Sequence, residues 1–82
     1  MDDEGMLRDL VAFIARSVVD DPAAVDVTVR EQDRAFIVEL RVAPADMGKV
    51  IGRGGRIARA MRTVVRAAAL KSGSRVMLEI LQ

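Results

Sequence analysis

Cysteine, histidine, tryptophan and tyrosine are all absent from this chain of 82 residues. Without cysteine there is no disulfide framework and no thiolate chemistry. Without histidine, the commonest general base and a usual zinc ligand are also missing, so any chemistry would depend on carboxylates, lysines and hydroxyl groups. We therefore expect a protein that is not an enzyme and that uses no metal and no cofactor.

Long apolar runs are absent too. No segment approaches the length of a membrane span, and the acidic start at Asp2, Asp3 and Glu4 is unlike the basic start of a signal peptide. These features predict a cytoplasmic protein that is not bound to a membrane. Apolar residues make up 51% of the chain, which suits one domain over residues 1–82 with an aliphatic core.

Helical signals occur in three places. The first helix has apolar residues at helical intervals, at Leu7, Leu10, Val11, Ile14 and Val18. The second is a short turn over residues 47–51, for which Asp46 is the expected N-cap. The third is a long helix that follows a glycine-rich segment and ends at Ser72 and Gly73, two residues typical of a helix C-terminus.

Alternating apolar residues predict three strands, over residues 25–29, 36–42 and 76–80. The polar residues 31–34 form a connection short enough to join the first two strands as an antiparallel hairpin. The order of elements is therefore helix, strand, strand, short helix, long helix, strand.

Charge is divided unevenly along the chain. Residues 1–46 carry five basic and eleven acidic side chains, whereas residues 47–82 carry eight basic and one acidic. Net charges of −6 and +7 are thus hidden within a total of +1. Because a polyanion responds to the local field of a protein, the second part of the chain is the candidate partner for one.

Glycines cluster at residues 52–55, at the start of this basic part. A dinucleotide-binding fingerprint needs a small residue where Ile57 stands, and a P-loop needs a hydroxyl residue where Val50 follows the Gly-Lys pair. A Gly-x-x-Gly turn between two helices remains. Such glycines let a sugar-phosphate backbone approach the main chain, and the next helix offers free N–H groups. Arg53 and Arg56 add positive charge beside them.

The segment from Val50 to Arg56, preceded by Asp46-Met47-Gly48-Lys49, resembles the signature of the KH domain, and the order αββααβ resembles its type II arrangement. The run continuing to Arg62 and the chain length resemble the KhpA family of small bacterial single-KH proteins. This resemblance covers essentially the whole chain. It implies an α+β fold, with a three-stranded sheet packed on helices, and a single-stranded RNA-binding protein that acts as an RNA chaperone or post-transcriptional regulator.

A binding site at the glycine turn is also implied by the resemblance. Residues 52–55 would hold the RNA backbone, Val50 and Ile51 would line the cleft, and the strand that begins near Arg34 would form its opposite wall. The predicted RNA-binding residues are Lys49, Val50, Ile51, Gly52, Arg53, Gly54, Gly55, Arg56 and Arg59. A basic stripe of Arg59, Arg62 and Arg66 runs along the long helix, either as a solvated face or as part of this site.

The resemblance further implies a homodimer, or a heterodimer with a larger KH-containing protein. An alternative function is an assembly adaptor, in which the KH fold presents a protein-interaction face and RNA binding is incidental. In this alternative, the alanines at 67–69 would allow close helix contact. Met6 and Phe13 lie off the main stripe of the first helix, and we expect them to widen its core face rather than to form a contact surface.

Overall fold

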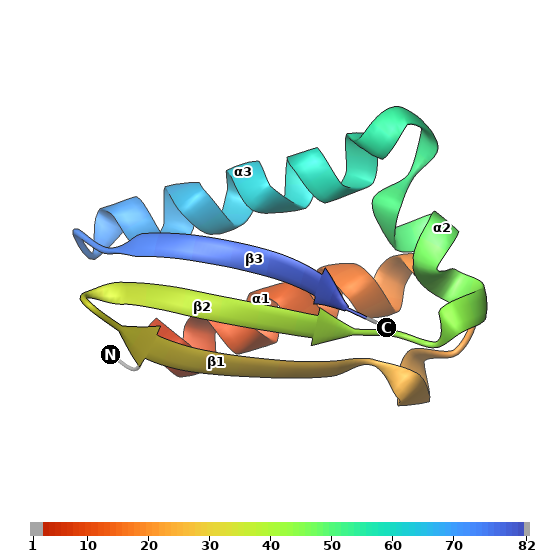
Figure 1. The fold of residues 1–82 in the computed structure, drawn as a ribbon, viewed down its shortest axis with the longest axis horizontal. Coiled ribbons are helices and arrows are strands. Elements are labelled where there is room, and N and C mark those ends of the chain that lie inside the picture. The colour runs from red at the N-terminus through yellow and green to blue at the C-terminus, as the bar shows by residue number, and fades with distance from the viewer. Residues whose placement is uncertain (1–2, 82) are drawn as a thin grey trace.

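The computed structural model describes residues 3–81 and has helices on one face of a three-stranded sheet (Figure 1). The elements are α1 (Asp3–Val18), β1 (Asp26–Gln32), β2 (Ala35–Arg41), α2 (Met47–Ile51), α3 (Arg56–Lys71) and β3 (Arg75–Leu81). Single 3-10 turns at Pro22–Ala24, Pro44–Asp46 and Arg53–Gly55 connect them. The predicted α+β class and αββααβ order are confirmed.

The β1–β2 hairpin is tighter than the sequence suggested. Glu31 and Gln32 belong to β1 and pair with Phe36 and Ala35, so the connection consists of Asp33 and Arg34 alone. Both of these residues have positive φ, 52° and 66°. Two such residues in sequence give the turn whose twist matches that of antiparallel strands.

Strand β3 lies parallel to β2 and completes a sheet with the order β1-β2-β3. The pairs Phe36↔Val76 and Val38↔Leu78 place apolar residues of both strands on the same face of the sheet. A parallel pair needs a crossover, which α2 and α3 supply. The sheet therefore ends in β3 on the side of α3, with β2 at its centre.

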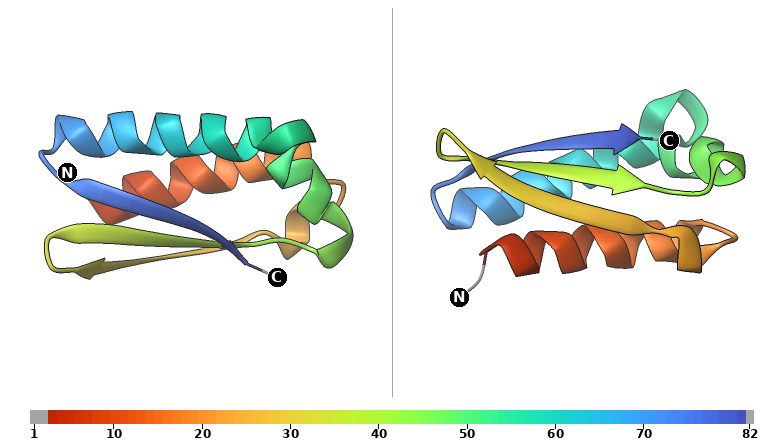
Figure 2. Two further views of the ribbon diagram at one scale, coloured as in Figure 1. Left: turned by 45° about the horizontal axis from the view of Figure 1, so that its top comes forward. Right: turned by 60° about the horizontal axis from the view of Figure 1, so that its bottom comes forward.

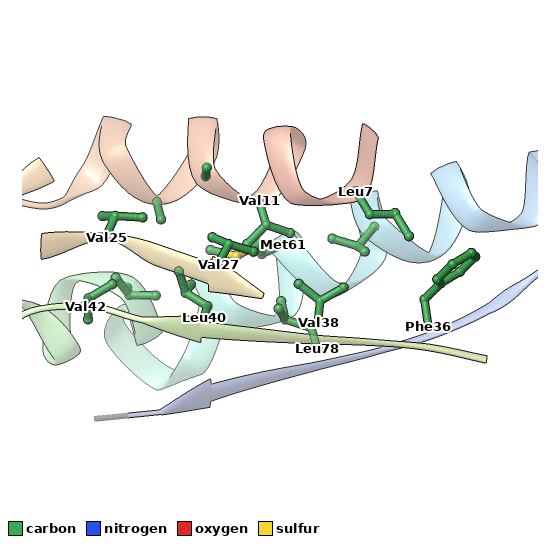
Figure 3. Close-up of a cluster of buried hydrophobic side chains, with 14 residues drawn as sticks. Leu7, Val11, Val25, Val27, Phe36, Val38, Leu40, Val42, Met61 and Leu78 are labelled. Carbon is green, nitrogen blue, oxygen red and sulfur yellow. The ribbon is translucent and has the colours of Figure 1, made fainter. Parts of the chain in front are cut away.

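Helices α1 and α3 cover the same face of the sheet (Figure 2). Between these two layers lies an aliphatic core, part of which Figure 3 shows, and which includes Leu7, Val11, Val25, Val27, Phe36, Val38, Leu40, Val42, Val50, Met61, Val65 and Leu78. Met6 packs against it, as expected. Phe13 is 71% exposed, so the prediction that it widens the core was wrong.

The two ends of α3 are both shaped by glycine. At its C-terminus Gly73 has a φ of 73° and donates from its N–H to the carbonyl of Leu70, while Ser74 donates to that of Ala69. This pair of bonds is the Schellman arrangement, and it confirms the helix end predicted at Ser72 and Gly73. The N-terminus of α3 follows the glycine turn, at the opposite end of the molecule (Figure 1).

Candidate nucleic-acid interface

Residues 52–55 form an open turn between α2 and α3, here called the glycine loop. Its three glycines all have positive φ, at 79° for Gly52, 65° for Gly54 and 77° for Gly55. The N–H of Gly55 donates to the carbonyl of Gly52 at 3.1 Å, which closes the turn. Residues with a side chain rarely adopt this conformation, so the glycine spacing follows from the backbone path.

The loop has an inner and an outer side. A Cβ atom at Gly52 would lie 2.8 Å from Cγ1 of Ile57 and 2.9 Å from its backbone nitrogen, so Gly52 sits directly against the start of α3. A Cβ atom at Gly54 would meet nothing within 4 Å. Arg53 and Gly54 are exposed. The outer side of the loop is therefore bare main chain facing solvent.

Arg53 and Arg56 flank this bare main chain, and both side chains are exposed. Within residues 3–81, neither guanidinium forms an ion pair with a carboxylate. Arg59, one turn into α3, donates from Nη1 to the carbonyl of Gly54 at 2.8 Å. The charges of Arg53 and Arg56 are thus not paired with carboxylates of the acidic part of the chain.

Lys49 is held differently from these arginines. Its Nζ lies 3.0 Å from Oδ2 of Asp20 and 3.7 Å from Oδ1 of Asp46. The hydrogen bond with Asp20, then its negative charge, raise the pKa of Lys49 above the ordinary value of 10.5. What this pairing contributes to stability is present below the pKa of the unfolded chain and is lost as the pH rises through the raised pKa, so it is intact at neutral pH.

Asp46 does not cap α2, contrary to the sequence prediction. Its side chain instead accepts a hydrogen bond from the backbone N–H of Asp21 at 3.0 Å, while its other oxygen faces Lys49. Only 2% of Asp46 is exposed. A tertiary contact to the α1–β1 connection has replaced the local capping bond, and it fixes the base of α2.

Replacing Asp46 by alanine is expected to destabilise the protein by about 2 kcal/mol, because the N–H of Asp21 loses its acceptor in a partly buried place. Thermal denaturation followed by circular dichroism measures this. Asp46→Asn keeps an acceptor oxygen and is expected to lose less. Asp20→Ala, at a side chain 79% exposed, is the control and is expected to change stability by less than about 0.5 kcal/mol. Equal losses in Asp46→Ala and Asp20→Ala would contradict this role for Asp46.

Val50 and Ile51 separate in the structure. Ile51 is 39% exposed beside the loop, but Val50 is fully buried in the core. Val50 therefore anchors α2 to the core. The expectation that its side chain lines the cleft was wrong. Alternation along a helix of five residues could not show which of two neighbouring apolar residues points inward.

A groove of about 220 Å³ runs between α3 and β3. Its lining residues are Arg62, Val65, Arg66, Val76, Met77 and Leu78. Strand β3 forms the wall of this groove that faces α3. None of the lining residues belongs to the glycine loop, so the expectation that the strand beginning near Arg34 forms a wall of the RNA cleft stays a prediction. Arg62 and Arg66, which the sequence left as either a solvated face or part of the site, both border this groove.

Residues 8–80 match the family model described as KhpA/KhpB, KH domain. The chain belongs to this family. It is 55% identical over 75 residues to the RNA-binding protein KhpA of Caldanaerobacter subterraneus, an alignment covering 92% of this chain and 100% of that one. It is 50% identical over 76 residues to the RNA-binding protein KhpA of Aquifex aeolicus, covering 93% and 96% of the two chains.

The fold is shared with a larger protein. The crystal structure of Aquifex aeolicus Era bound to GDP.AlF4- superposes with a TM-score of 0.65 at 18% identity, over 98% of this chain. Era in complex with MgGDPNP and nucleotides of 16S ribosomal RNA gives a TM-score of 0.66. The chain spans about a third of the length of these structures, at 31% and 30%. The likeness supports the KH fold and nothing further.

Two features near the site were not predicted from the sequence. The clamp of Asp20 and Asp46 around Lys49 joins residues far apart in the sequence, and no spacing rule links them. The groove residues of β3 alternate as in an ordinary strand, so nothing in their spacing indicated a groove. No group of three potential metal ligands, and no helix suited to crossing a membrane, occurs within residues 3–81.

Proposed function

We propose that this protein binds single-stranded RNA, catalyses no reaction, and holds the RNA backbone at the glycine loop. The observation that carries the proposal is the bare outer side of that loop, placed at the N-terminus of a 16-residue helix and flanked by the unpaired Arg53 and Arg56. The partial positive charge of a helix N-terminus and unpaired guanidinium groups together suit phosphate. The relatives named RNA-binding protein KhpA support this reading.

In this proposal, residues 52–56 contact the backbone while the bases lie toward the groove between α3 and β3. Ile51 offers apolar surface beside the loop. Lys49 contacts a phosphate in this proposal only by leaving its pairing with Asp20 and Asp46. KH domains hold about four nucleotides in this way. The protein has no tyrosine or tryptophan on which bases could stack, so backbone contacts carry most of the affinity. A cytoplasmic RNA chaperone or post-transcriptional regulator is the role we propose.

Fluorescence anisotropy with a labelled single-stranded RNA tests the proposal. We expect affinity to fall steeply between 50 and 200 mM salt, with log K falling by about 0.7 per phosphate contacted for each unit of log salt concentration. An RNA duplex should compete poorly. Absence of binding at low salt would contradict the function.

We also propose that two copies pair through the outer face of the helices. An apolar depression of about 230 Å³ opens there, between α1 and α3, lined by Ile14, Ile57, Ala60, Met61, Val64 and the apolar atoms of Arg56. Val64 is 43% exposed on α3, and Phe13 is 71% exposed on α1. Pairing would bury this surface and link two weak RNA sites into one stronger one. A larger KH-containing partner, as the family description KhpA/KhpB suggests, would use the same face.

Val64→Glu is expected to raise the dissociation constant of the dimer at least about tenfold, because it places a charge in an apolar contact. Sedimentation velocity over a range of protein concentrations measures the change. Thr63→Glu, at the exposed neighbour on the same helix, is the charge-matched control and should leave the dimer intact. A wild-type protein that stays monomeric at millimolar concentration would contradict the pairing.

The assembly adaptor remains the second candidate, because the same exposed apolar face would also serve it. The two functions differ in what the glycine loop does. If the protein is an adaptor, altering the loop should change neither its RNA retention nor its binding to a partner. If it is an RNA-binding protein, altering the loop should abolish RNA binding and leave partner binding unchanged. The variant that carries both Arg53→Asp and Gly54→Asp therefore separates the two functions.

A further inference from the structure

The peptide unit between Gly54 and Gly55 is held at both of its polar ends. The N–H of Gly55 donates to the carbonyl of Gly52 at 3.1 Å, and the carbonyl of Gly54 accepts from Nη1 of Arg59 at 2.8 Å. Packing does not hold this unit, since a Cβ atom at Gly54 would meet nothing within 4 Å. Hydrogen bonds alone therefore fix its orientation.

Arg59 is placed to do this by the helix itself. A side chain in the second turn of a helix is directed back toward the N-terminus, and here that direction leads over the loop. Nη1 of Arg59 also lies 3.4 Å from where a Cβ atom of Gly55 would be, so it contacts the carbonyl of Gly54 and lies beside Gly55. Among residues 3–81, this is the one hydrogen bond from a side chain to the loop.

Arg56 provides the contrast. It is exposed, begins the same helix, and forms no hydrogen bond or ion pair with another side chain in residues 3–81. Its guanidinium is thus free to reach a phosphate, while that of Arg59 is already engaged by the protein.

We infer that Arg59 is a positioning residue, which orients the Gly54–Gly55 peptide for the RNA backbone and is not itself a phosphate contact. This inference rests on the proposed RNA-binding function. It separates two arginines that sequence alone groups together, because loss of a phosphate contact changes the salt dependence of binding, whereas loss of preorganisation lowers affinity equally at every salt concentration.

The experiment compares Arg59→Gln with Arg56→Gln, two variants that remove the same charge from the same helix. For Arg59→Gln we expect a five- to tenfold loss of affinity with an unchanged slope of log K against log salt. For Arg56→Gln we expect the slope to become shallower by about 0.7, the value of one phosphate contact on a single strand. A slope for Arg59→Gln that falls as it does for Arg56→Gln would overturn the inference.

A second readout needs no RNA. Backbone ¹⁵N relaxation of Gly54 and Gly55 in the free protein is expected to show lower order parameters in Arg59→Gln and wild-type values in Arg56→Gln. Unchanged order in Arg59→Gln would overturn the inference even if wild-type binding is normal. If the wild type fails to bind RNA, the proposed function fails, while the loop measurement still decides whether Arg59 orders the loop. Arg59→Lys keeps the charge with a shorter reach, and full recovery of affinity in that variant would also count against positioning.

Discussion

Replacing Arg53 and Gly54 together by aspartate is expected to weaken RNA binding by at least about a hundredfold. The change turns one positive charge into two negative ones on the bare outer side of the loop, where the phosphates of the proposed complex would lie. Anisotropy titrations at constant salt measure the loss. Folding should persist, because a side chain at Gly54 points into open space and aspartate tolerates a left-handed backbone at a cost of about 1 kcal/mol.

The chain supplies a closely matched control for this variant. Gly73 has a φ of 73° and open space at its Cβ position, and the exposed Arg75 lies two residues beyond it. Gly73→Asp with Arg75→Asp therefore imposes the same charges and a similar backbone strain at the other end of α3 (Figure 1). We expect this control to retain most of the RNA affinity. RNA retention by the loop variant equal to that of the control would contradict the proposed function and favour the adaptor.

The second large effect concerns stability. Gly52→Ala is expected to destabilise the fold by about 2 to 4 kcal/mol, since its φ of 79° and ψ of 168° lie in a region that is essentially restricted to glycine. Its new Cβ would also overlap the backbone nitrogen of Ile57, which cannot move without shifting α3. For a domain of this size the melting temperature should fall by roughly 10 to 20 °C.

Gly48→Ala is the matched control, four residues earlier in the same sequence. Gly48 lies inside α2, and a Cβ atom there would meet nothing within 4 Å. Alanine in a helix is favoured over glycine by about 0.5 to 1 kcal/mol, so this variant should be as stable as the wild type or slightly more stable. A Gly52→Ala protein with the same melting temperature as the wild type would contradict the positive φ at Gly52 and its close contact with Ile57.

The fold was largely predictable because its elements carry strong periodic signals. Alternating valines marked β1, and Gly73 marked the end of α3. The exposure of Phe13 and Val64 was not predictable in this way. Periodicity shows which residues are apolar, but it does not distinguish an apolar residue of the core from one on a surface that pairs with another molecule.

The site was predictable where it depends on local backbone. Gly52 and Gly54 have their spacing because the chain turns there, and the sequence shows this directly. Contacts between residues that are distant in the sequence could not be predicted. Asp46 resembles an N-cap by its position, and only the fold brings the N–H of Asp21 to its side chain. Val50 and Ile51 are equally apolar neighbours, and packing alone decides which one is buried.

The parallel pairing of β2 with β3 makes the sheet depend on residues about 40 positions apart, such as Phe36 and Val76. During synthesis the hairpin of β1 and β2 can form early, but the free edge of β2 stays unpaired until β3 has left the ribosome. The glycine loop lies within the intervening crossover. A nascent chain can therefore hold the glycine loop in its folded position only once β3 has paired with β2, and a chain truncated before β3 should lack the proposed RNA site.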